Sequence, residues 1–388
     1  MIILDKPFIS DFLIETVKKY NCPVLENSVT SELNLNKSVN LISEEEARKY
    51  LLSCNNPYLY TNSENSIEWI INNLNGHKLS MQIELFKDKY KFRQLVQRLY
   101  PDFFYTELNR DELDTFDFTV ITRPFVIKPS VGFFSIGVKI VFPEDDWESV
   151  KTHIKTEIGK FEKSYPKPVL TTTRLIIEEY VSGDEYAFDA YFDKEGNPVI
   201  LNIFKHLYSS ENDTRDRVYI SSKKVIEENL TPFSEFLRKV GQLADLKNFP
   251  LHTEVRVNNQ GEVIPIEINP LRFGGWCTTA DSTYFAYGVN SYQYYLEGKV
   301  PAWRQIFEGK EDYLYTVIVL ENSTGIASAD ITGFDYEKLL TKFEHPLELR
   351  RTDYKNFHVF GFLFTETHKN NFTELEYILN SDLKEFIL

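Results

Sequence analysis

The sequence predicts a chain of mixed α/β and α+β class, and its patterning changes twice. Over the first 85 residues short apolar runs alternate with helical patterns, which is typical of a small α/β domain with a parallel sheet. Strands and hairpins with long helices between them follow. From about Tyr313 the order strand, helix, strand, strand, helix indicates a small α+β lobe.

The N-terminal region repeats the order strand then helix. We expect strands at 1–4, 23–25 and 57–60, and helices at 9–20, from about 44, and at 67–74. Ser43 followed by Glu46 fits a capping box, which predicts where the second of these helices begins.

The middle region begins with a helix expected at 88–100, which Pro101 stops. Further strands are expected at 125–128, 137–142, 175–180, 185–192 and 199–204, and long helices at 144–163 and 234–247. In the third region helices are expected at 336–343 and 373–388, with a strand at 357–365. We therefore predict an N-terminal α/β domain at 1–85, a middle domain at 86–300 and a C-terminal α+β lobe at 301–388.

The composition excludes several classes of partner. The chain has 388 residues and a net charge of −15, whereas nucleic acids and anionic membranes need a basic surface. Cys22, Cys54 and Cys277 are too few and too scattered for a disulfide framework. No apolar run approaches 18 residues. We expect a cytoplasmic protein that binds neither nucleic acid nor membrane.

Residues 251–276 predict a β-hairpin whose turn ends at Gly261. In its second strand three isoleucines alternate with other residues, so Glu267 and Asn269 point to the opposite face. An even register places Glu254 directly or diagonally opposite Glu267, with their Cβ atoms within roughly 4.5–8 Å. Two such carboxylates repel unless a cation such as Mg²⁺ lies between them. The alternatives are a solvated strand face, or a bulge that separates the two glutamates.

Two segments of the middle region suggest phosphate binding. Lys128 ends an apolar strand, where it either points its ammonium at a phosphate or is a solvated charge. Residues 130–137 contain two glycines and two serines, which suit a phosphate cradle or a plain hairpin turn. Phe133 and Phe134 within this loop could form a flap over a ligand.

Other polar segments allow a binding role or a simpler one. The strand end at 175–181 offers backbone groups to an adenine edge, or is only one arm of a hairpin. His206, Arg215 and Arg217 could bind a carboxylate, although a solvated loop is the better interpretation. His252 is expected to be structural rather than a metal ligand.

The order of these motifs is more specific than any one of them. Asp88-Lys89, the loop from Lys128 to Gly137, EEYVSGDE at 178–185 and the E…EINP hairpin follow one another along the chain. Together they resemble the ATP-grasp superfamily, which includes biotin carboxylase, D-alanine:D-alanine ligase, carbamoyl phosphate synthetase and bacterial L-amino acid ligases. The resemblance covers roughly residues 85–295, and EINPLRFGG looks closest to the branch of L-amino acid ligases and carbamoyl phosphate synthetase-like enzymes. It implies an ATP-grasp fold after an N-terminal Rossmann-like domain.

The resemblance also implies how ATP is held. Lys89 and Lys128 would contact the phosphates, and Ser130 and Ser135 would line the phosphate loop. The residues implied for adenine and ribose are Glu178, the backbone of Glu179, Tyr180 and Val181, and Glu185.

Glu254, Glu267 and Asn269 would bind one or two Mg²⁺ ions, with Mn²⁺ as an alternative. Arg272 would act with Lys128 in catalysis and face the transferred phosphoryl group or the reacting carboxylate, although it stands one residue further from Asn269 than the commonest NPR spacing places it.

The function implied is an ATP-dependent carboxylate–amine ligase that forms an amide or peptide bond through an acylphosphate and releases ADP and phosphate. Its substrates would be a small carboxylate and a small amine, and a homodimer is compatible with the family. The alternatives are a non-catalytic ATP-binding protein and an ATP-grasp carboxylase or kinase-like enzyme.

Overall fold

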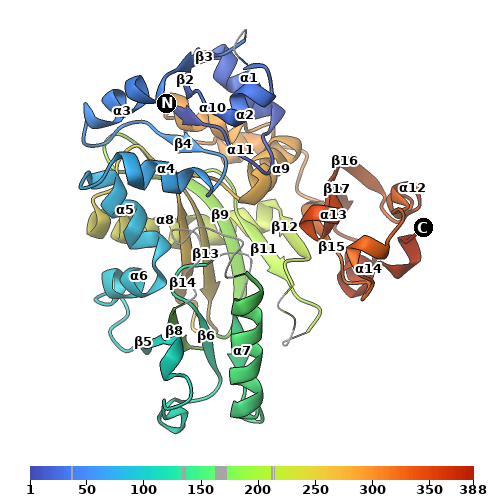
Figure 1. Cartoon of the computed structure of the whole chain (residues 1–388). Coiled ribbons are helices and arrows are strands. Elements are labelled where there is room, and N and C mark those ends of the chain that lie inside the picture. Colours follow the sequence, from blue (N-terminus) through green and yellow to red (C-terminus); the bar gives the residue numbers. More distant parts are fainter. Residues whose placement is uncertain (36–37, 133–136, 162–172, 211–212, 214) are drawn as a thin grey trace.

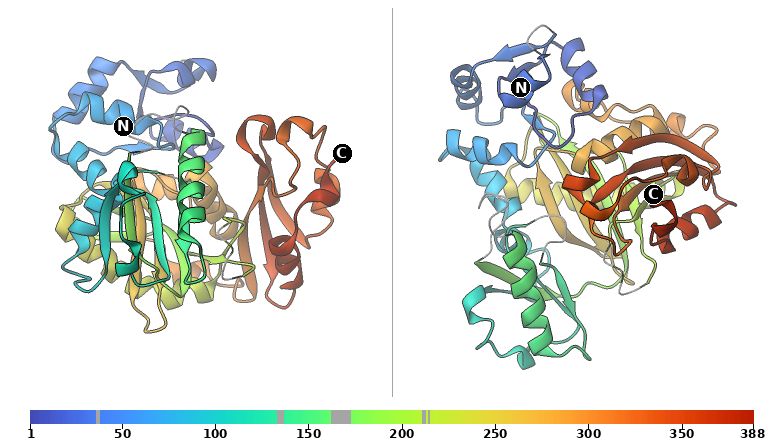
Figure 2. Two further views of the ribbon diagram at one scale, coloured as in Figure 1. Left: turned by 60° about the horizontal axis from the view of Figure 1, so that its bottom comes forward. Right: turned by 45° about the vertical axis from the view of Figure 1, so that its right-hand side comes forward.

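The computed structural model describes residues 1–35, 38–132, 137–161, 173–210, 213 and 215–388. Its described strands form three sheets: a parallel N-terminal sheet, a small antiparallel sheet and a large antiparallel sheet. Figure 1 shows the N-terminal sheet above the large sheet, and the small sheet with helix α7 below it. The right-hand view of Figure 2 shows that the small sheet and the N-terminal domain lie at opposite ends of the molecule.

The N-terminal domain has the predicted parallel sheet. Its strands β1 (Ile2–Ile3), β2 (Pro23–Leu25), β3 (Asn40–Ile42) and β4 (Tyr60–Thr61) lie in the order β3-β2-β1-β4. The helices between and after them are α1 (Asp11–Lys19), α2 (Ser28–Glu32), α3 (Glu44–Leu52) and α4 (Ser66–Asn73). The predicted capping box is confirmed, since Ser43 Oγ accepts from the Glu46 N–H and the Glu46 carboxylate accepts from the Ser43 N–H. The sequence did not predict β3 or α2, which are too short for a periodic pattern.

Two consecutive helices lead from this domain into the rest of the chain, α5 (Lys78–Lys87) and α6 (Lys89–Val96). Asp88 caps α6, because its carboxylate accepts from the N–H groups of Tyr90 and Lys91. The helix ends at Val96, before the predicted end at Tyr100.

The small sheet is antiparallel, in the order β5-β8-β6-β7. Its strands are β5 (Tyr105–Asn109), β6 (Phe125–Pro129), β7 (Lys139–Val141) and β8 (Arg174–Glu179). Alternate residues such as Phe125 and Ile177 pack against Val150 and Ile154 of α7 (Trp147–Phe161). Because side chains alternate along a strand, Lys128 and Glu178 point to the opposite face of the sheet.

The large sheet contains nine described strands, in the order β14-β13-β9-β11-β12-β15-β17-β16 with β10 also pairing with β9. They are β9 (Asp184–Phe192), β10 (Pro198–Ile200), β11 (Phe204–Leu207), β12 (Val218–Ser221), β13 (Phe249–Val257), β14 (Val263–Pro270), β15 (Tyr313–Glu321), β16 (His345–Arg351) and β17 (Val359–His368). Strand β15 hydrogen-bonds to β12, so the strands of the predicted C-terminal lobe continue this sheet. The remaining helices are α8 (Lys223–Ala244), α9 (Thr278–Tyr287), α10 (Ser291–Glu297), α11 (Trp303–Ile306), α12 (Tyr336–Leu340), α13 (Tyr354–Phe357) and α14 (Thr373–Asn380).

Helix α8 begins at Lys223, well before the predicted start at residue 234. The expected start lies just after Pro232, a residue type that lacks an N–H and usually breaks a helix. Phe233, Phe236, Leu237 and other apolar residues of one face are buried against the large sheet. Tertiary packing of this face therefore outweighs the local effect of the proline.

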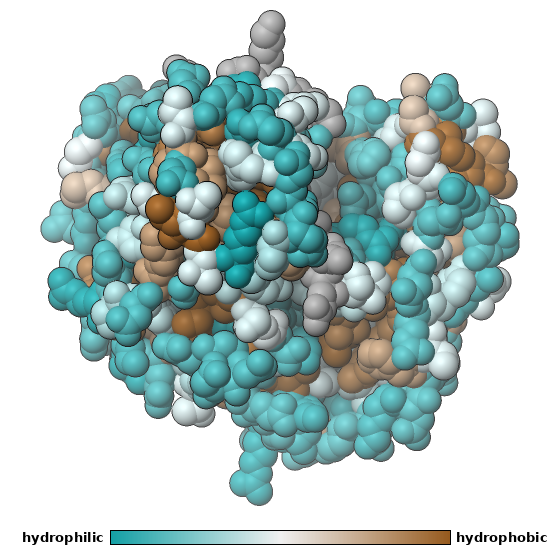
Figure 3. Space-filling view, turned by 90° about the horizontal axis from the view of Figure 1, so that it is seen from below, coloured by the Kyte–Doolittle hydropathy of each residue, from teal (hydrophilic) through white to brown (hydrophobic). Residues whose placement is uncertain are grey.

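The exposed surface agrees with the hydrophilic composition of the chain. Figure 3 shows that hydrophilic side chains cover most of the face seen from below, with apolar residues in separate patches. No helix within the described residues is long and apolar enough to cross a bilayer.

Two helical glycines give a matched test of this packing. A Cβ at Gly241 of α8 would lie 2.3 Å from Cε1 of Phe192, whereas a Cβ at Gly159 of α7 meets no atom within 4 Å. We expect Gly241→Ala to lower the free energy of unfolding by about 1–3 kcal/mol through overpacking. Gly159→Ala should raise it by up to about 1 kcal/mol. Urea denaturation of both variants measures these changes, and equal effects would contradict the packing of α8 on β9.

Candidate active site

The hairpin β13–β14 brings the predicted metal ligands to one face of the large sheet. Glu254 pairs directly with Glu267, and His252 pairs with Asn269. The register shifts between Glu254 and Val255, on the turn side of the two glutamates, so the bulge does not separate them. The predicted hairpin and its glutamate pair are therefore confirmed.

The two glutamates differ in their surroundings. Glu267 is 2.9 Å from Lys89 Nζ, and its other carboxylate oxygen accepts from the Asn269 amide at 2.9 Å. Burial favours a higher pKa for Glu267, but Lys89 and its other partners outweigh it and lower the pKa to about 2. Burial and the charge of Glu267 instead raise the pKa of Glu254. Glu267 is thus the ionised carboxylate that Lys89 and Asn269 hold, and Glu254 is the one whose ionisation is disfavoured.

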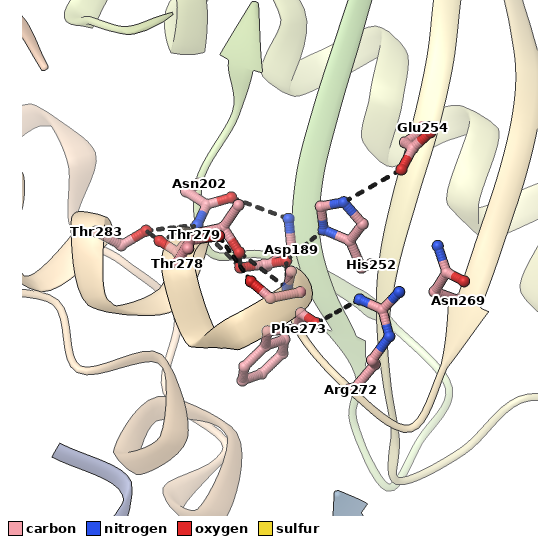
Figure 4. Close-up of polar contacts among 12 residues, drawn as sticks. Asp189, Asn202, His252, Glu254, Asn269, Arg272, Phe273, Thr278, Thr279 and Thr283 are labelled. Carbon is pink, nitrogen blue, oxygen red and sulfur yellow. Dashed lines mark hydrogen bonds and ion pairs between the residues drawn. The ribbon is translucent and has the colours of Figure 1, made fainter. Parts of the chain in front are cut away.

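His252 connects this face to a buried polar network around Asp189 (Figure 4). Its Nδ1 lies 2.7 Å from Asp189 Oδ1 and its Nε2 lies 3.7 Å from Glu254 Oε1. Burial alone lowers the pKa of His252, but these two carboxylates raise it to about 9. The imidazole is accordingly a cation between two acids.

Asp189 also fixes the loop that follows β14. Its carboxylate accepts from the Gly274 N–H at 2.9 Å, the Thr279 hydroxyl at 2.6 Å and the Asn202 amide at 3.1 Å. A Cβ at Gly274 would lie 2.2 Å from Thr279 Oγ1, so only glycine fits there. Sequence reasoning missed Asp189, and the available signal was a charged residue inside the apolar run of β9.

Lys128 lies in a buried charge cluster on the small sheet rather than at a solvated strand end. Its ammonium forms an ion pair with Glu178, whose other oxygen is 2.7 Å from Arg93 Nε. The side chains of these residues are 5%, 4% and 3% exposed, respectively. Burial alone would raise the pKa of Glu178, but Arg93 and Lys128 lower it to about 2. Burial lowers the pKa of Lys128, and the neighbouring cations Lys89 and Arg93 add to this effect.

Lys89 and Ser130 lie together where the small sheet meets the large one. The Lys89 N–H donates to the Ser130 carbonyl at 2.7 Å, and its ammonium donates to the Gly132 carbonyl at 3.0 Å. Ser130 is fully buried, and its hydroxyl has no partner among the described residues. An unpaired buried donor beside two lysines fits a bound phosphate oxygen. Ser135, with Phe133 and Phe134, lies outside the described residues.

The segment predicted to hold adenine connects β8 of the small sheet to β9 of the large sheet. Two of its backbone groups are already used, because the Glu179 N–H donates to the Phe104 carbonyl and the Val181 carbonyl accepts from Arg256. Gly183 is required in this connection, since a Cβ there would lie 2.1 Å from the Val257 carbonyl oxygen.

Glu185, the residue predicted to bind ribose, lies at the start of β9. It accepts from Arg256 Nε at 2.8 Å and lies 3.5 Å from Nδ1 of His206. Burial opposes ionisation, but these partners lower the pKa of Glu185 to about 2. Tyr180 in the connecting segment lies under the Arg256 guanidinium, 5.2 Å from ring centroid to Cζ.

The predicted solvated loop is wrong for two of its three residues. His206 is 3% exposed and Arg217 is fully buried, while Arg215 is half-buried in an ion pair with Asp213. The ring of Trp276 packs against Phe357 at the end of α13 and against Phe362 of β17. It is half-buried, which leaves part of the ring accessible.

Arg272 is directed at a residue that sequence reasoning did not consider. Its Nη2 lies 2.5 Å from Oε1 of Glu64 in the N-terminal domain.

Within the described residues no group of three His, Cys, Asp or Glu side chains is arranged for a metal ion. The oxygen donors at the hairpin are therefore two carboxylates and the Asn269 amide, which suits a hard cation that keeps other ligands.

Residues 121–280 match the family model described as ATP-grasp domain. An L-amino acid ligase from Bacillus licheniformis aligns over 100% of this chain and 97% of its own, with a TM-score of 0.70 and 17% identity. N5-carboxyaminoimidazole ribonucleotide synthetase from Thermotoga maritima aligns over 100% and 98%, with a TM-score of 0.60 and 14% identity. The 2-oxoglutarate carboxylase biotin carboxylase domain from Hydrogenobacter thermophilus, solved with MgADP and bicarbonate, aligns over 94% and 85%, with a TM-score of 0.58 and 14% identity. No curated protein sequence gives a significant match.

The cluster around Glu178 makes a stability prediction. Glu178→Gln leaves Lys128 and Arg93 buried without their shared counter-charge, so we expect the free energy of unfolding to fall by about 3–5 kcal/mol. Glu179→Gln is the matched control, because the neighbouring side chain is exposed and should change stability by less than about 0.5 kcal/mol. Chemical denaturation measures both variants.

The effect of Glu178 should also depend on pH. Its pKa in the folded protein is about 2, below the ordinary 4.5, so its stabilising contribution is present above pH 4.5 and is lost as the pH falls toward 2. The difference between wild type and Glu178→Gln should therefore shrink over this range. A difference that grows on acidification would contradict the assigned ion pairs.

Proposed function

The chain has the ATP-grasp fold and carries an ATP-grasp domain, as the order of its motifs predicted, and on this premise we propose that it is an ATP-dependent carboxylate–amine ligase. The observation that carries the proposal is the pairing of Glu254 with Glu267 beside Lys89. In the proposal, this pair of carboxylates binds the metal ion, and Lys89 beside it contacts a phosphate. The similarity of the whole chain to an L-amino acid ligase supports the choice of reaction.

In this proposal the small and large sheets hold ATP between them. Lys128 and Lys89 neutralise the phosphates, and the buried hydroxyl of Ser130, which has no partner in the described part of the chain, donates to a phosphate oxygen. The connecting segment, with Glu178 and the backbone of Glu179, Tyr180 and Val181, faces adenine, and Glu185 faces the ribose. Arg256 already donates hydrogen bonds to the Val181 carbonyl and the Glu185 carboxylate. A nucleotide bound there must therefore share these two acceptors with Arg256 or displace its guanidinium from them.

Glu254, Glu267 and Asn269 would hold Mg²⁺, or Mn²⁺ in its place. Bound there, the ion would draw charge from the phosphate oxygens and orient them. The protein's part is to supply two opposed carboxylates at a fixed spacing, one of them already oriented by Lys89 and Asn269. A biotin carboxylase domain with this fold was solved with MgADP, which supports the same donor chemistry.

The proposed reaction has two steps. A substrate carboxylate oxygen bonds to the γ-phosphorus as the bond to the β,γ-bridging oxygen breaks, which gives an acylphosphate and ADP. The amine nitrogen then bonds to the acyl carbon, the carbon–oxygen bond to phosphate breaks, and the amine loses a proton. Lys128 stabilises the charge of the transferred group in the first step, and Arg272 stabilises the tetrahedral oxyanion in the second.

The proposal predicts that ADP release requires MgATP together with a carboxylate and an amine. A panel of amino acids, assayed for ADP and for product mass, should identify an active pair. Glu267→Gln should reduce this rate at least about 100-fold, because several kcal/mol of charge stabilisation are lost.

Glu262→Gln is the control in the same hairpin, since Glu262 is exposed at the turn and should leave the rate unchanged. If MgATP binds but no pair in the panel releases ADP, the ligase proposal fails.

A further inference from the structure

The residue that lengthens the spacing between Asn269 and Arg272 has a defined structural role. Leu271 adopts a left-handed backbone conformation with φ of 63°, and its side chain is 1% exposed in the core. Its N–H donates to the Pro250 carbonyl at 2.8 Å, and its carbonyl accepts from the Thr61 N–H at 2.9 Å. The turn is thus fixed to β13 on one side and to the N-terminal domain on the other, and it directs Arg272 toward that domain.

Glu64, four residues after the start of β4, receives Arg272 there. Its Oε1 accepts from Arg272 Nε at 3.1 Å and from Nη2 at 2.5 Å, and its Oε2 lies 2.5 Å from Lys87 Nζ. The Phe273 carbonyl accepts from the remaining guanidinium nitrogen, Nη1, at 2.8 Å. All three Arg272 nitrogens are therefore held, and Glu64 holds two of them.

The electrostatics show what competes with Glu64. Burial lowers the pKa of Arg272, but Glu64, and after it Glu267 and Glu254, raise it above its ordinary value. The charges of the hairpin carboxylates therefore act on the same guanidinium that Glu64 holds. The side chains of Glu64 and Arg272 are 12% and 10% exposed, so water screens this competition weakly.

We infer that Glu64 is a positioning residue, which holds Arg272 away from Glu254 and Glu267 and so keeps a further cation, in addition to Lys89, from competing there with a divalent ion. The N-terminal domain thereby supplies a side chain that the metal-binding face depends on. The inference rests on the proposed role of the two hairpin glutamates in metal binding. Without the charge of Glu64, the Arg272 guanidinium pairs with the hairpin carboxylates and competes with the cation.

The test uses the full-length protein without nucleotide and Mn²⁺ alone as the probe, with free Mn²⁺ measured by electron paramagnetic resonance. Glu64→Gln keeps the shape of the side chain and removes its charge, so the dissociation constant for Mn²⁺ should rise about 10-fold or more. Glu68→Gln, in the first turn of α4, is the matched control and should bind Mn²⁺ like the wild type.

A double-mutant cycle separates this role from a general structural one. In an Arg272→Met background no guanidinium remains to compete, so Glu64→Gln should have no further effect on Mn²⁺ affinity. If Glu64→Gln fails to fold, Glu64→Asp replaces it in the cycle. The shorter aspartate side chain keeps the negative charge but reaches Lys87 and Arg272 poorly.

Three results would overturn the inference: a wild type that binds no Mn²⁺, an unchanged affinity in the Glu64 variants, or an equal loss with and without Arg272. The measurement involves neither ATP nor a substrate. An inactive substrate panel together with the expected Mn²⁺ cycle would reject the ligase proposal and leave the role of Glu64 intact.

Discussion

The ion pair between Lys89 and Glu267 joins parts of the chain that are far apart in sequence. Lys89 is the first residue of α6, its ammonium also binds the Gly132 carbonyl after β6, and Glu267 lies in β14. The Asp88 cap of the same helix pairs with Arg174 of β8 at 2.5 Å. The start of α6 therefore ties the small sheet to the large sheet, and it supplies the positive charge that lets two glutamates face each other.

Buried charge around the site follows one rule, in which each carboxylate is shared between cationic or hydrogen-bonding partners. Glu178 lies between Arg93 and Lys128, Glu64 between Lys87 and Arg272. Such pairs are stable only if both members stay, because removing one leaves a desolvated charge. In the proposed function, a nucleotide therefore exchanges partners with these residues when it binds. The same arrangement lets the N-terminal domain influence the hairpin through a single carboxylate.

Local patterning was enough for most of the fold. The Ser43–Glu46 capping box, the strands β8 and β9 and the hairpin at 251–276 depend on neighbours in sequence, and all were predicted. The start of α8 was not, because burial of its apolar face against the large sheet outweighs the effect of Pro232. The burial of Lys128 was missed for a related reason, since its partners Glu178 and Arg93 come from β8 and α6. A charged side chain that the sequence predicts to be solvated can instead be buried and paired with a charge from a distant segment.

The sequence by itself determined the order of the elements, the parallel N-terminal sheet, and the alternation that puts Glu254, Glu267 and Asn269 on one face. These features follow from backbone periodicity and from spacing along a single segment. Only the tertiary structure decided that Asp189 anchors His252 and Gly274, and that Glu64 receives Arg272. Those contacts join residues whose separation in sequence carries no periodic signal, and they are selected because a buried charge must find its partner wherever the fold brings one.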